Sequence, residues 1–586
     1  MSTTGNSGGA GPVPSLPTET GHSDLVSRLV AEAFSGLTRR DPRSAGFTPS
    51  VPSAPSAVPT TEAAAPVHTP SALPPVHPNS QPAAPAPAAP VATESGKTPS
   101  GGHAPESNDS YAYGEPRCKY ARNSPGGCPD SQRGKSGNKT TGAGVIPAEP
   151  EAAPEYYFLR QPELSGKSPA AFTSYPKTSV PVPKFDVEGV RRDFPALHQT
   201  VNGKPLVWLD NAATTHKPQA VIDATSQFYG RDNSNIHRAA HTLAARSTEL
   251  FEAGREKVRQ FLGATDAKEI IFVRGTTEGI NLVAQSYGRQ NVGPGDEIIV
   301  SELEHHANIV PWQLLAKQVG ATVRVIPIND RGELILEEYV KLLGPRTKLV
   351  SVAHVSNSLG TINPVEQIIA LAHARGVPVL VDGAQSTPHL PVNVTGLDAD
   401  FYVFSGHKIF GPTGIGAVYG KAALLESMPP WQGGGHMIRD VRFEKTVYQD
   451  APEKFEAGTP DIAGVVGLGA AIDYLFKVGI PGIAAYEHAL LEYATPALAT
   501  IPGLRFIGTA TNKASVLSFV IPGVPNEQIA RHLDQHGIAV RAGHHCAQPA
   551  IRHFGLETSV RPSLAFYNTR AEVDALVSVL RTLKRN

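Results

Sequence analysis

The sequence has few cysteines, no long apolar run and no excess of charge of either sign. Only three cysteines occur among 586 residues, at Cys118, Cys128 and Cys546, which excludes a disulfide framework. No run of 18 apolar residues occurs, and the first residues lack the basic and apolar regions of a secretory signal, so we expect a cytoplasmic protein without a membrane span. The 52 basic and 53 acidic residues give a net charge of -1, which disfavours binding to nucleic acid or to an anionic membrane.

Proline is concentrated at the start of the chain. More than half of the 53 prolines fall within residues 1–184, where Pro, Ala, Ser and Thr dominate long stretches. Such sequence buries too little apolar surface to offset the entropy of ordering, so we predict a disordered extension over 1–184. Within it, apolar residues at helical spacing predict a short helix over 24–38 with Ser23 as its N-cap. Aromatic clusters at 111–132 and 156–160 suggest docking motifs.

The composition changes near Phe185, and apolar runs then alternate with helical periodicity to the end of the chain. Helical spacing covers 280–288, 309–319 and 365–375. Strand-like runs lie at 269–273, 297–300, 322–326, 349–354, 377–381, 401–404 and 416–419. This alternation predicts an α/β fold with a mainly parallel, doubly wound sheet of seven strands.

A smaller α+β domain is predicted beside this sheet. Shorter strand-like runs lie at 516–521, 539–541 and 563–565. We place the large domain at about 200–445, and we assign 185–199 together with 446–586 to the small domain. No period of 20–50 residues recurs, which excludes repeat architectures.

Two polar features follow predicted strands at the edge where open parallel sheets place their ligands. After the first strand, Gly275, Thr276 and Thr277 open a predicted helix, whose N–H groups and hydroxyls suit a phosphate. The alternative is a simple N-cap. Asp382 ends another apolar run and suits a cation such as a protonated pyridine nitrogen. Its alternative is a carboxylate that only forms a turn.

A lysine follows a third buried strand. The segment Ser405-Gly-His407-Lys408 precedes a glycine-rich turn, which is an unusual setting for a surface lysine. Burial beside another cationic group lowers the pKa of a lysine and leaves its amine free as a nucleophile and base. Lys408 is therefore a candidate for a Schiff base with a carbonyl cofactor.

Cys546 is the sole cysteine after residue 185, and it follows two histidines, His544 and His545. A protonated histidine favours the thiolate, which is the nucleophilic form. Zinc binding is a rival interpretation, but contiguous His-His-Cys without a second spaced pair of ligands does not match a tetrahedral structural site. A silent core cysteine is the remaining alternative, which the polar neighbours disfavour.

Five motifs in one order make the chain similar to a known family. They are Trp208-Leu-Asp210-Asn-Ala-Ala-Thr-Thr-His-Lys-Pro, Glu304-His305-His306-Ala-Asn, Asp382-Gly-Ala-Gln385, Ser405-Gly-His407-Lys408 and Arg541-Ala-Gly-His-His-Cys546. Together they resemble the cysteine desulfurases, and most closely the second group, typified by the enzyme of the Suf sulfur-mobilisation system. The resemblance covers residues 185–586.

The resemblance implies a fold type I homodimer that depends on pyridoxal 5'-phosphate (PLP), needs no metal and converts L-cysteine to L-alanine, leaving a persulfide on Cys546. The implied catalytic residues are Cys546, Lys408 and His305. The implied cofactor ligands are Lys408 as the Schiff base, His305 stacked on the ring, Asp382 at the pyridine nitrogen, Gln385 at the phenolic oxygen, Thr276, Thr277, Ser405 and His407 at the phosphate, and Thr459 at the phosphate of the other subunit. The implied substrate ligands are Arg561, Asn357, His237 and Arg541.

The extension over 1–184 departs from the family, whose members usually begin near the position of Phe185. It is similar to the segments that direct some desulfurases into encapsulin shells, which would place the enzyme in such a compartment. An organelle transit peptide and a solubilising tail are alternatives, and the transit peptide is disfavoured by early acidic residues. For the activity, the alternatives are a selenocysteine lyase, an aminotransferase-like enzyme, or chiefly a cargo or interaction protein with vestigial catalysis. A sulfur-acceptor protein is the other expected partner.

Overall fold

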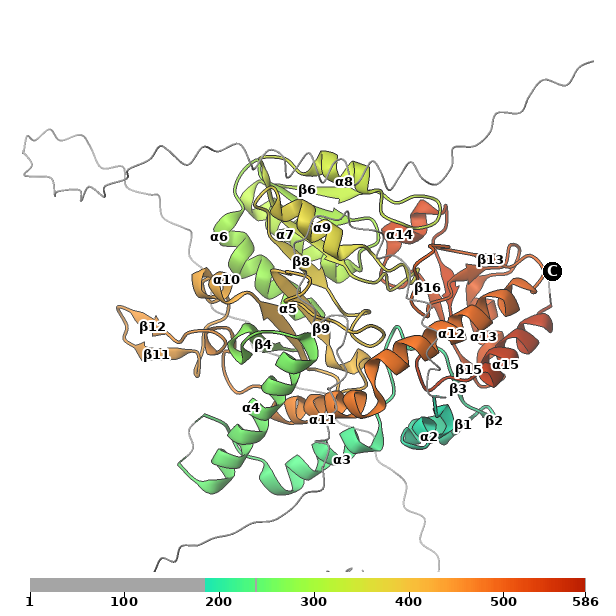
Figure 1. Cartoon of the computed structure of the whole chain (residues 1–586), viewed down its shortest axis with the longest axis horizontal. Coiled ribbons are helices and arrows are strands. Elements are labelled where there is room, and N and C mark those ends of the chain that lie inside the picture. Colours follow the sequence, from blue (N-terminus) through green and yellow to red (C-terminus); the bar gives the residue numbers. More distant parts are fainter. Residues whose placement is uncertain (1–184, 238–239, 585–586) are drawn as a thin grey trace, which may run out of the picture. The chain divides into compact units, whose positions relative to one another are not determined.

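The computed structural model describes residues 185–237 and 240–584 (Figure 1). The predictions that concern 1–184, namely the disordered extension, the helix over 24–38, the aromatic clusters and the thiols of Cys118 and Cys128, lie outside the described residues.

A seven-stranded sheet forms the centre of the larger part, in the order β4-β10-β9-β8-β7-β5-β6. The strands are β4 (Ile270–Val273), β10 (Gly416–Gly420), β9 (Phe401–Ser405), β8 (Val379–Asp382), β7 (Thr347–Ala353), β5 (Glu297–Ser301) and β6 (Thr322–Ile326). Only β10 is antiparallel to its neighbours, β4 and β9, whereas the other pairs in this sheet are parallel. The predicted mainly parallel sheet of seven strands is confirmed.

Both faces of this sheet are buried, which is why its strands read as continuous apolar runs rather than alternating ones. In β4, Ile270 and Phe272 belong to one core cluster, and Ile271 and Val273 belong to another. The helices on the first side are α4 (Thr242–Leu262), α8 (Leu336–Leu342), α9 (Val365–His373) and α11 (Ile462–Val478), and those on the second are α5 (Thr276–Val283), α7 (Val310–Val319) and α10 (Ala422–Ser427). The sheet is therefore doubly wound.

A smaller sheet of four strands follows in the sequence, in the order β13-β14-β17-β16. Its strands are β13 (Arg505–Phe506), β14 (Phe519–Val520), β17 (Ser559–Arg561) and β16 (Arg541–Gly543), and its helices are α12 (Ile480–Ala499), α13 (Asn526–Asp534) and α15 (Arg570–Arg581). Figure 1 shows these helices in orange and red, gathered around the smaller sheet. They share a separate apolar cluster with it, so this part has its own core.

One strand of the smaller sheet lies elsewhere than the sequence predicts. The expected strand at 563–565 is wrong, because the strand ends at Arg561 and Ser563 makes only isolated bridges to Asp210 and Val516. Pro562 carries no backbone N–H and so cannot donate to the ladder beyond Arg561.

The remaining elements are short connections and edges. They are α2 (Val187–Arg192), β1 (Thr200–Val201), β2 (Lys204–Pro205), β3 (Val207–Trp208), which pairs with β15 (Ile538–Ala539), α3 (Gln219–Gln227), α6 (Arg289–Asn291), the hairpin of β11 (Ile438–Val441) and β12 (Thr446–Tyr448), and α14 (Gln548–His553). Within the described ranges no single helix is long and apolar enough to cross a membrane, while α11 and α12, which meet at 74°, pass that test only as a bent pair.

Candidate active site

One cavity lies at the carboxyl ends of the parallel strands, where the sequence predicts a ligand. Its volume is about 250 Å³. The predicted site residues that line it are Thr276, Thr277, His305, Asn357, Asp382, Gln385, Ser405, His407, Lys408, Arg541, Cys546 and Arg561. They come from five strand ends of the large sheet and from the segment around β16 and β17. Tertiary folding thus gathers side chains that are up to 285 positions apart, from Thr276 to Arg561.

Lys408 stands on a 3₁₀ turn, Gly406–Lys408, directly after β9. Its pKa falls from 10.5 to about 8, chiefly because burial penalises the charged amine, whereas the nearby Asp382 opposes this shift. A substantial fraction of the amine is therefore unprotonated at mildly alkaline pH. An amine in this state is a nucleophile and a base.

The start of α5 and the end of β9 form a close polar contact. Gly275 has φ of +146°, and a Cβ at this position would lie 3.0 Å from Oγ of Ser405. The N–H of Thr276 donates to Oγ of Ser405 at 2.9 Å, and the two hydroxyls also lie 2.9 Å apart. No side chain caps the helix from Gly275. Gly275 is the N-cap of α5, as the alternative foresees, and the hydroxyls of Thr276 and Ser405 also line the cavity, where a helix start with hydroxyls suits a phosphate.

Asp382 ends β8 and is buried. One of its carboxylate oxygens accepts a hydrogen bond from the N–H of Ala384 at 2.9 Å, so the turn foreseen as an alternative does form. The carboxylate also lines the cavity. Burial raises its pKa, and the hydrogen bond from Ala384 and the charge of Lys408 lower it. A buried carboxylate in this position is stabilised by a cationic partner, as a protonated pyridine nitrogen would be.

His305 and Gln385 complete the walls of the cavity. Burial and the charge of Lys408 lower the pKa of His305 to about 3, so its ring is neutral. Its Nδ1 accepts a hydrogen bond from the N–H of Ala307 at 3.0 Å. The amide of Gln385 donates to the carbonyl of Ala212 at 2.6 Å. A neutral, fixed imidazole suits stacking against an aromatic cofactor.

Cys546 lies on a strained loop between β16 and α14. Both His545 and Cys546 have φ of 54°, a region that residues with side chains rarely adopt. Hydrogen bonds from two other segments of the chain hold the loop. The side-chain amide of Asn357 donates to the carbonyl of His545 at 2.6 Å, and the backbone N–H of His306 donates to the carbonyl of Cys546 at 2.7 Å. These bonds fix a partly exposed thiol at the mouth of the cavity.

Arg561 is buried at the end of β17 and is oriented by two groups. It donates to the carbonyl of Asn357 at 2.9 Å and to a carboxylate oxygen of Asp210 at 3.0 Å. Its Nε has no hydrogen-bond partner. Burial raises the pKa of Asp210, while the charge of Arg561 lowers it. Asp210 is a site residue with no role predicted from the sequence, although a buried arginine requires a carboxylate and Asp210 belongs to one of the five motifs.

Glu304 is a second residue whose role sequence analysis missed. It is buried after β5, where its carboxylate accepts hydrogen bonds from Ser301, from Asn308 at 2.6 Å and from the N–H of Ala353 at 3.0 Å. Burial raises its pKa to about 7. Because Ala353 belongs to β7, Glu304 ties the loop that carries His305 to the neighbouring strand.

The structure does not bring His237 and Thr459 to this cavity within one chain. His237 bonds to Glu252 at 2.9 Å and stacks on His436 with ring centroids 4.3 Å apart. Thr459 accepts a hydrogen bond from Asn235 at 3.3 Å. His237 has φ of 61° before α4, and Glu252, its partner, belongs to that helix. The predicted reach of Thr459 concerns the other subunit and stays a prediction.

Comparisons with known proteins agree with this geometry. Residues 207–576 match the family described as Aminotransferase class-V. The chain is 62% identical over 400 residues to a cysteine desulfurase of Synechococcus elongatus, covering 68% of this chain and 64% of that relative, which is less than two thirds of its length. It is 50% identical over 406 residues to a cysteine desulfurase of Dickeya dadantii, covering 69% of this chain and 98% of that relative. Among solved structures, the cysteine desulfurase CsdA from Escherichia coli superimposes with a TM-score of 0.64 at 45% identity, covering 68% of this chain and 98% of that one.

The doubly wound sheet with a lysine after β9 defines an enzyme of fold type I, the class that uses PLP. The chain belongs to the class-V aminotransferase family and, within it, to the cysteine desulfurases. The residues of the cavity fit PLP, because a buried carboxylate, a lysine with a lowered pKa and hydroxyl groups at a helix start face one space.

Proposed function

We propose that this chain converts L-cysteine to L-alanine with PLP and takes the sulfur onto Cys546. The observation that carries the proposal is that Lys408 and Cys546 line the same cavity, together with the carboxylate of Asp382. A base for the substrate carbon and a nucleophile for the substrate sulfur thus face one space.

The cofactor would be held by residues at the carboxyl ends of the strands of the large sheet. In this proposal Lys408 binds it covalently, Asp382 pairs with its ring nitrogen and His305 packs on the ring. Gln385 reaches its phenolic oxygen, and the phosphate lies against Thr276, Thr277, Ser405 and His407. When bound, PLP supplies an electron sink for the negative charge that develops on the substrate carbon.

Arg561 would bind the substrate carboxylate, with Asn357 and Arg541 beside it. Arg561 is buried and its Nε is unpartnered, so a carboxylate that enters the cavity meets a donor already desolvated. Bidentate binding of this kind orients the amino acid and sets which of its bonds faces Lys408. The pairing of Arg561 with Asp210 keeps the guanidinium in place before substrate arrives.

Lys408 would take the proton from the α-carbon of the substrate and return a proton to the product. This role requires an amine that is unprotonated once it is free of the cofactor, and the lowered pKa of about 8 of the free amine favours that state at mildly alkaline pH. Its place on a turn anchored to β9 limits how far the amine moves between the two transfers.

Cys546 would attack the substrate sulfur as a thiolate. A sulfur–sulfur bond forms, the carbon–sulfur bond of cysteine breaks, and the carbon keeps the electron pair until a proton reaches it. The products are alanine and a persulfide on Cys546, which a sulfur-acceptor protein or a reductant must then discharge. The protein is thereby restored without a net change in its oxidation state.

The test compares Cys546→Ala with Lys408→Ala in assays of alanine, sulfide and PLP absorbance. We expect Cys546→Ala to retain the visible absorbance of bound PLP and to lose nearly all alanine formation from cysteine. Lys408→Ala should lose covalent PLP and activity together. Full alanine production from cysteine by Cys546→Ala would reject the proposed role of the thiol, and production of pyruvate or of a transaminated product would reject the proposed reaction.

We also propose that the chain acts as a homodimer. Thr459 of each chain would then reach the phosphate of the cofactor in the other. A mixture of Lys408→Ala chains with Thr459→Val chains tests this sharing, because a mixed dimer contains one site with both defects and one site with neither. Mixed dimers without recovered activity would refute it.

The segment 1–184 is proposed to load the enzyme into an encapsulin shell. Its support is compositional, since a proline-rich tether with aromatic clusters suits docking to a repeated lattice, where many tethered copies gain avidity. Co-expression with candidate shell proteins should capture the full chain and leave a chain that starts at Phe185 outside. Equal capture of both would refute loading by this segment.

A further inference from the structure

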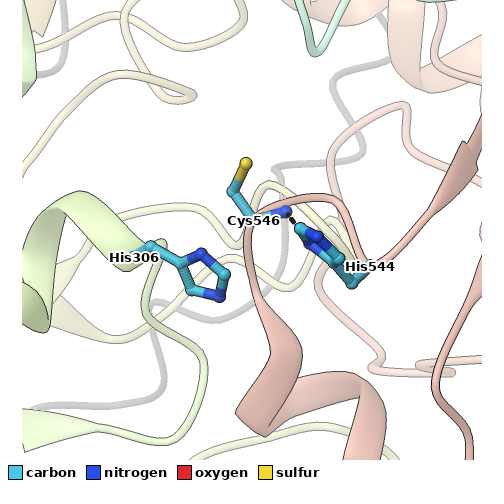
Figure 2. Close-up of side chains that lie close together, drawn as sticks. All are labelled: His306, His544 and Cys546. Carbon is cyan, nitrogen blue, oxygen red and sulfur yellow. Dashed lines mark hydrogen bonds between the residues drawn. The ribbon is translucent and has the colours of Figure 1, made fainter.

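Three potential metal ligands meet at the thiol, from segments far apart in the sequence. Figure 2 shows the rings of His306 and His544 on either side of the loop that carries Cys546, whose sulfur points upward in this view, and one nitrogen or sulfur atom of each residue lies within 4.8 Å of the others. His306 comes from the large sheet, after β5, whereas His544 and Cys546 follow β16 of the smaller sheet. This set differs from the contiguous His544-His545-Cys546 run of the sequence, because Nε2 of His545 bonds to the hydroxyl of Ser559 at 2.9 Å and His306 takes its place.

Both imidazoles turn an acceptor nitrogen towards the loop that carries the thiol. Nδ1 of His544 accepts from the N–H of Cys546 at 3.0 Å, and Nε2 of His306 accepts from the N–H of Gln548 at 3.3 Å. A nitrogen that accepts a hydrogen bond carries no proton, as metal binding requires, but its lone pair is engaged by the N–H, so a metal must displace that hydrogen bond to bind there. The rings lie 5.5 Å apart between centroids, on two sides of the thiol loop.

The donor set and its spacing suit zinc. Zinc binds cysteine sulfur at about 2.3 Å and histidine nitrogen at about 2.0–2.1 Å, which places tetrahedral ligand atoms roughly 3.3–3.6 Å apart. The three ligand atoms lie within 4.8 Å, so the side chains, of which His544 is exposed and His306 and Cys546 are half-buried, must rotate to bring them to these distances. His544 is exposed and Cys546 is partly exposed, which leaves a path for an ion and an open fourth position. Hard cations such as Mg²⁺ prefer oxygen ligands and do not match this set.

We propose that His306, His544 and Cys546 form a binding site for Zn²⁺ that occupies the persulfide-forming thiol and reversibly blocks sulfur transfer. On binding, the S–H bond of Cys546 breaks, a sulfur–zinc bond forms and one proton passes to the buffer, with no change of oxidation state. Zinc binding itself is independent of the proposed desulfurase reaction, whereas the inhibition rests on it.

The experiment measures zinc binding and thiol protection on the PLP-loaded full chain carrying Cys118→Ser and Cys128→Ser, so that Cys546 is the sole thiol. Equilibrium dialysis against Zn²⁺ should give one high-affinity ion per chain. His306→Gln, His544→Gln and Cys546→Ser should each weaken binding at least about 10-fold. His553→Gln is the matched control, since His553 lies on the adjacent α14 and bonds to Glu302, and it should leave binding unchanged. Mg²⁺ should not compete.

Thiol protection keeps the proposal testable if a variant fails to fold. Zn²⁺ should slow the alkylation of Cys546 by iodoacetamide at least about 10-fold in the chain with both histidines, and a chelator should restore the rate. High-affinity zinc binding that survives Cys546→Ser or both histidine substitutions would overturn the site, as would unchanged alkylation in excess Zn²⁺. Zinc binding and thiol protection without any loss of desulfurase activity would overturn the inhibitory role. The proposed reaction is tested separately, by alanine formation in the absence of zinc.

Discussion

Removal of the charge at Lys408 should stabilise the cofactor-free protein, and the gain should depend on pH. The pKa of this amine falls from 10.5 to about 8 on folding, mainly because burial disfavours the charged form. Each pKa unit corresponds to about 1.4 kcal/mol. Keeping Lys408 protonated in the folded chain therefore costs about 3 kcal/mol at pH 7. Lys408→Met replaces the amine with an apolar chain of similar length and should recover much of this cost.

The sign of the pH dependence follows from proton binding. Between pH 8 and 10.5 the unfolded chain holds the proton on Lys408 more tightly than the folded chain does, so the free energy of unfolding of the unsubstituted protein rises with pH. The advantage of Lys408→Met should thus be largest below pH 8 and should shrink towards pH 10.5. Urea unfolding of both proteins after removal of PLP, at several pH values from 7 to 10, measures this difference.

A constant difference across that range would refute the reasoning, because a packing effect of methionine does not titrate. A difference that grows with pH would have the wrong sign. Lys421→Met is the matched control, since the ion pairs with Asp398 and Asp400 raise the pKa of Lys421 rather than lower it. Its substitution should destabilise the chain below pH 10, in the opposite direction to Lys408→Met.

Three further substitutions test the structure. Arg255→Met should lower the free energy of unfolding by about 3–5 kcal/mol in urea titrations, because Arg255 and Glu456 form a buried bidentate pair at 2.7 and 2.9 Å and Glu456 would be left unpaired. Gly275→Ala should weaken retention of PLP on dialysis, followed by visible absorbance, since it adds about 1–3 kcal/mol of backbone strain and a contact at 3.0 Å with Ser405. Arg561→Lys keeps the charge but loses bidentate binding of the substrate carboxylate, and should raise KM for cysteine about tenfold with a smaller change in kcat.

The sequence predicts the large sheet and most of the cavity for one physical reason. Strands buried on both faces read as apolar runs, and polar residues that directly follow such runs must meet at one edge of a parallel sheet. Asp382, Ser405 and Lys408 each follow a run of this kind, and all three line the cavity. Their roles at the cofactor came from the resemblance to a family, since periodicity alone does not name a ligand.

The parts that sequence analysis missed depend on tertiary contacts. Asp210 meets Arg561 only because the segments that follow β3 and β17 are bridged at Asp210 and Ser563. His306 meets Cys546 only because the smaller sheet packs against the carboxyl edge of the larger one. The left-handed backbone at His545 and Cys546 also has no clear local signal, because positive φ is uncommon for any residue with a side chain, histidine included. It persists because hydrogen bonds from other segments hold it.

Asn357 shows how the two parts of the site are coupled. Its carbonyl accepts from Arg561, and its side-chain amide donates to the carbonyl of His545, the residue before the thiol. The group proposed to hold the substrate carboxylate and the loop that carries the nucleophile are thus positioned by one buried residue after β7. A shift of Asn357 would move Arg561 and the thiol loop together. The large sheet, which carries Asn357, therefore determines the distance between bound substrate and Cys546, even though the thiol belongs to the smaller part. The strain of two residues at φ of 54° is tolerated because releasing it would break this bond and the bond from His306 together.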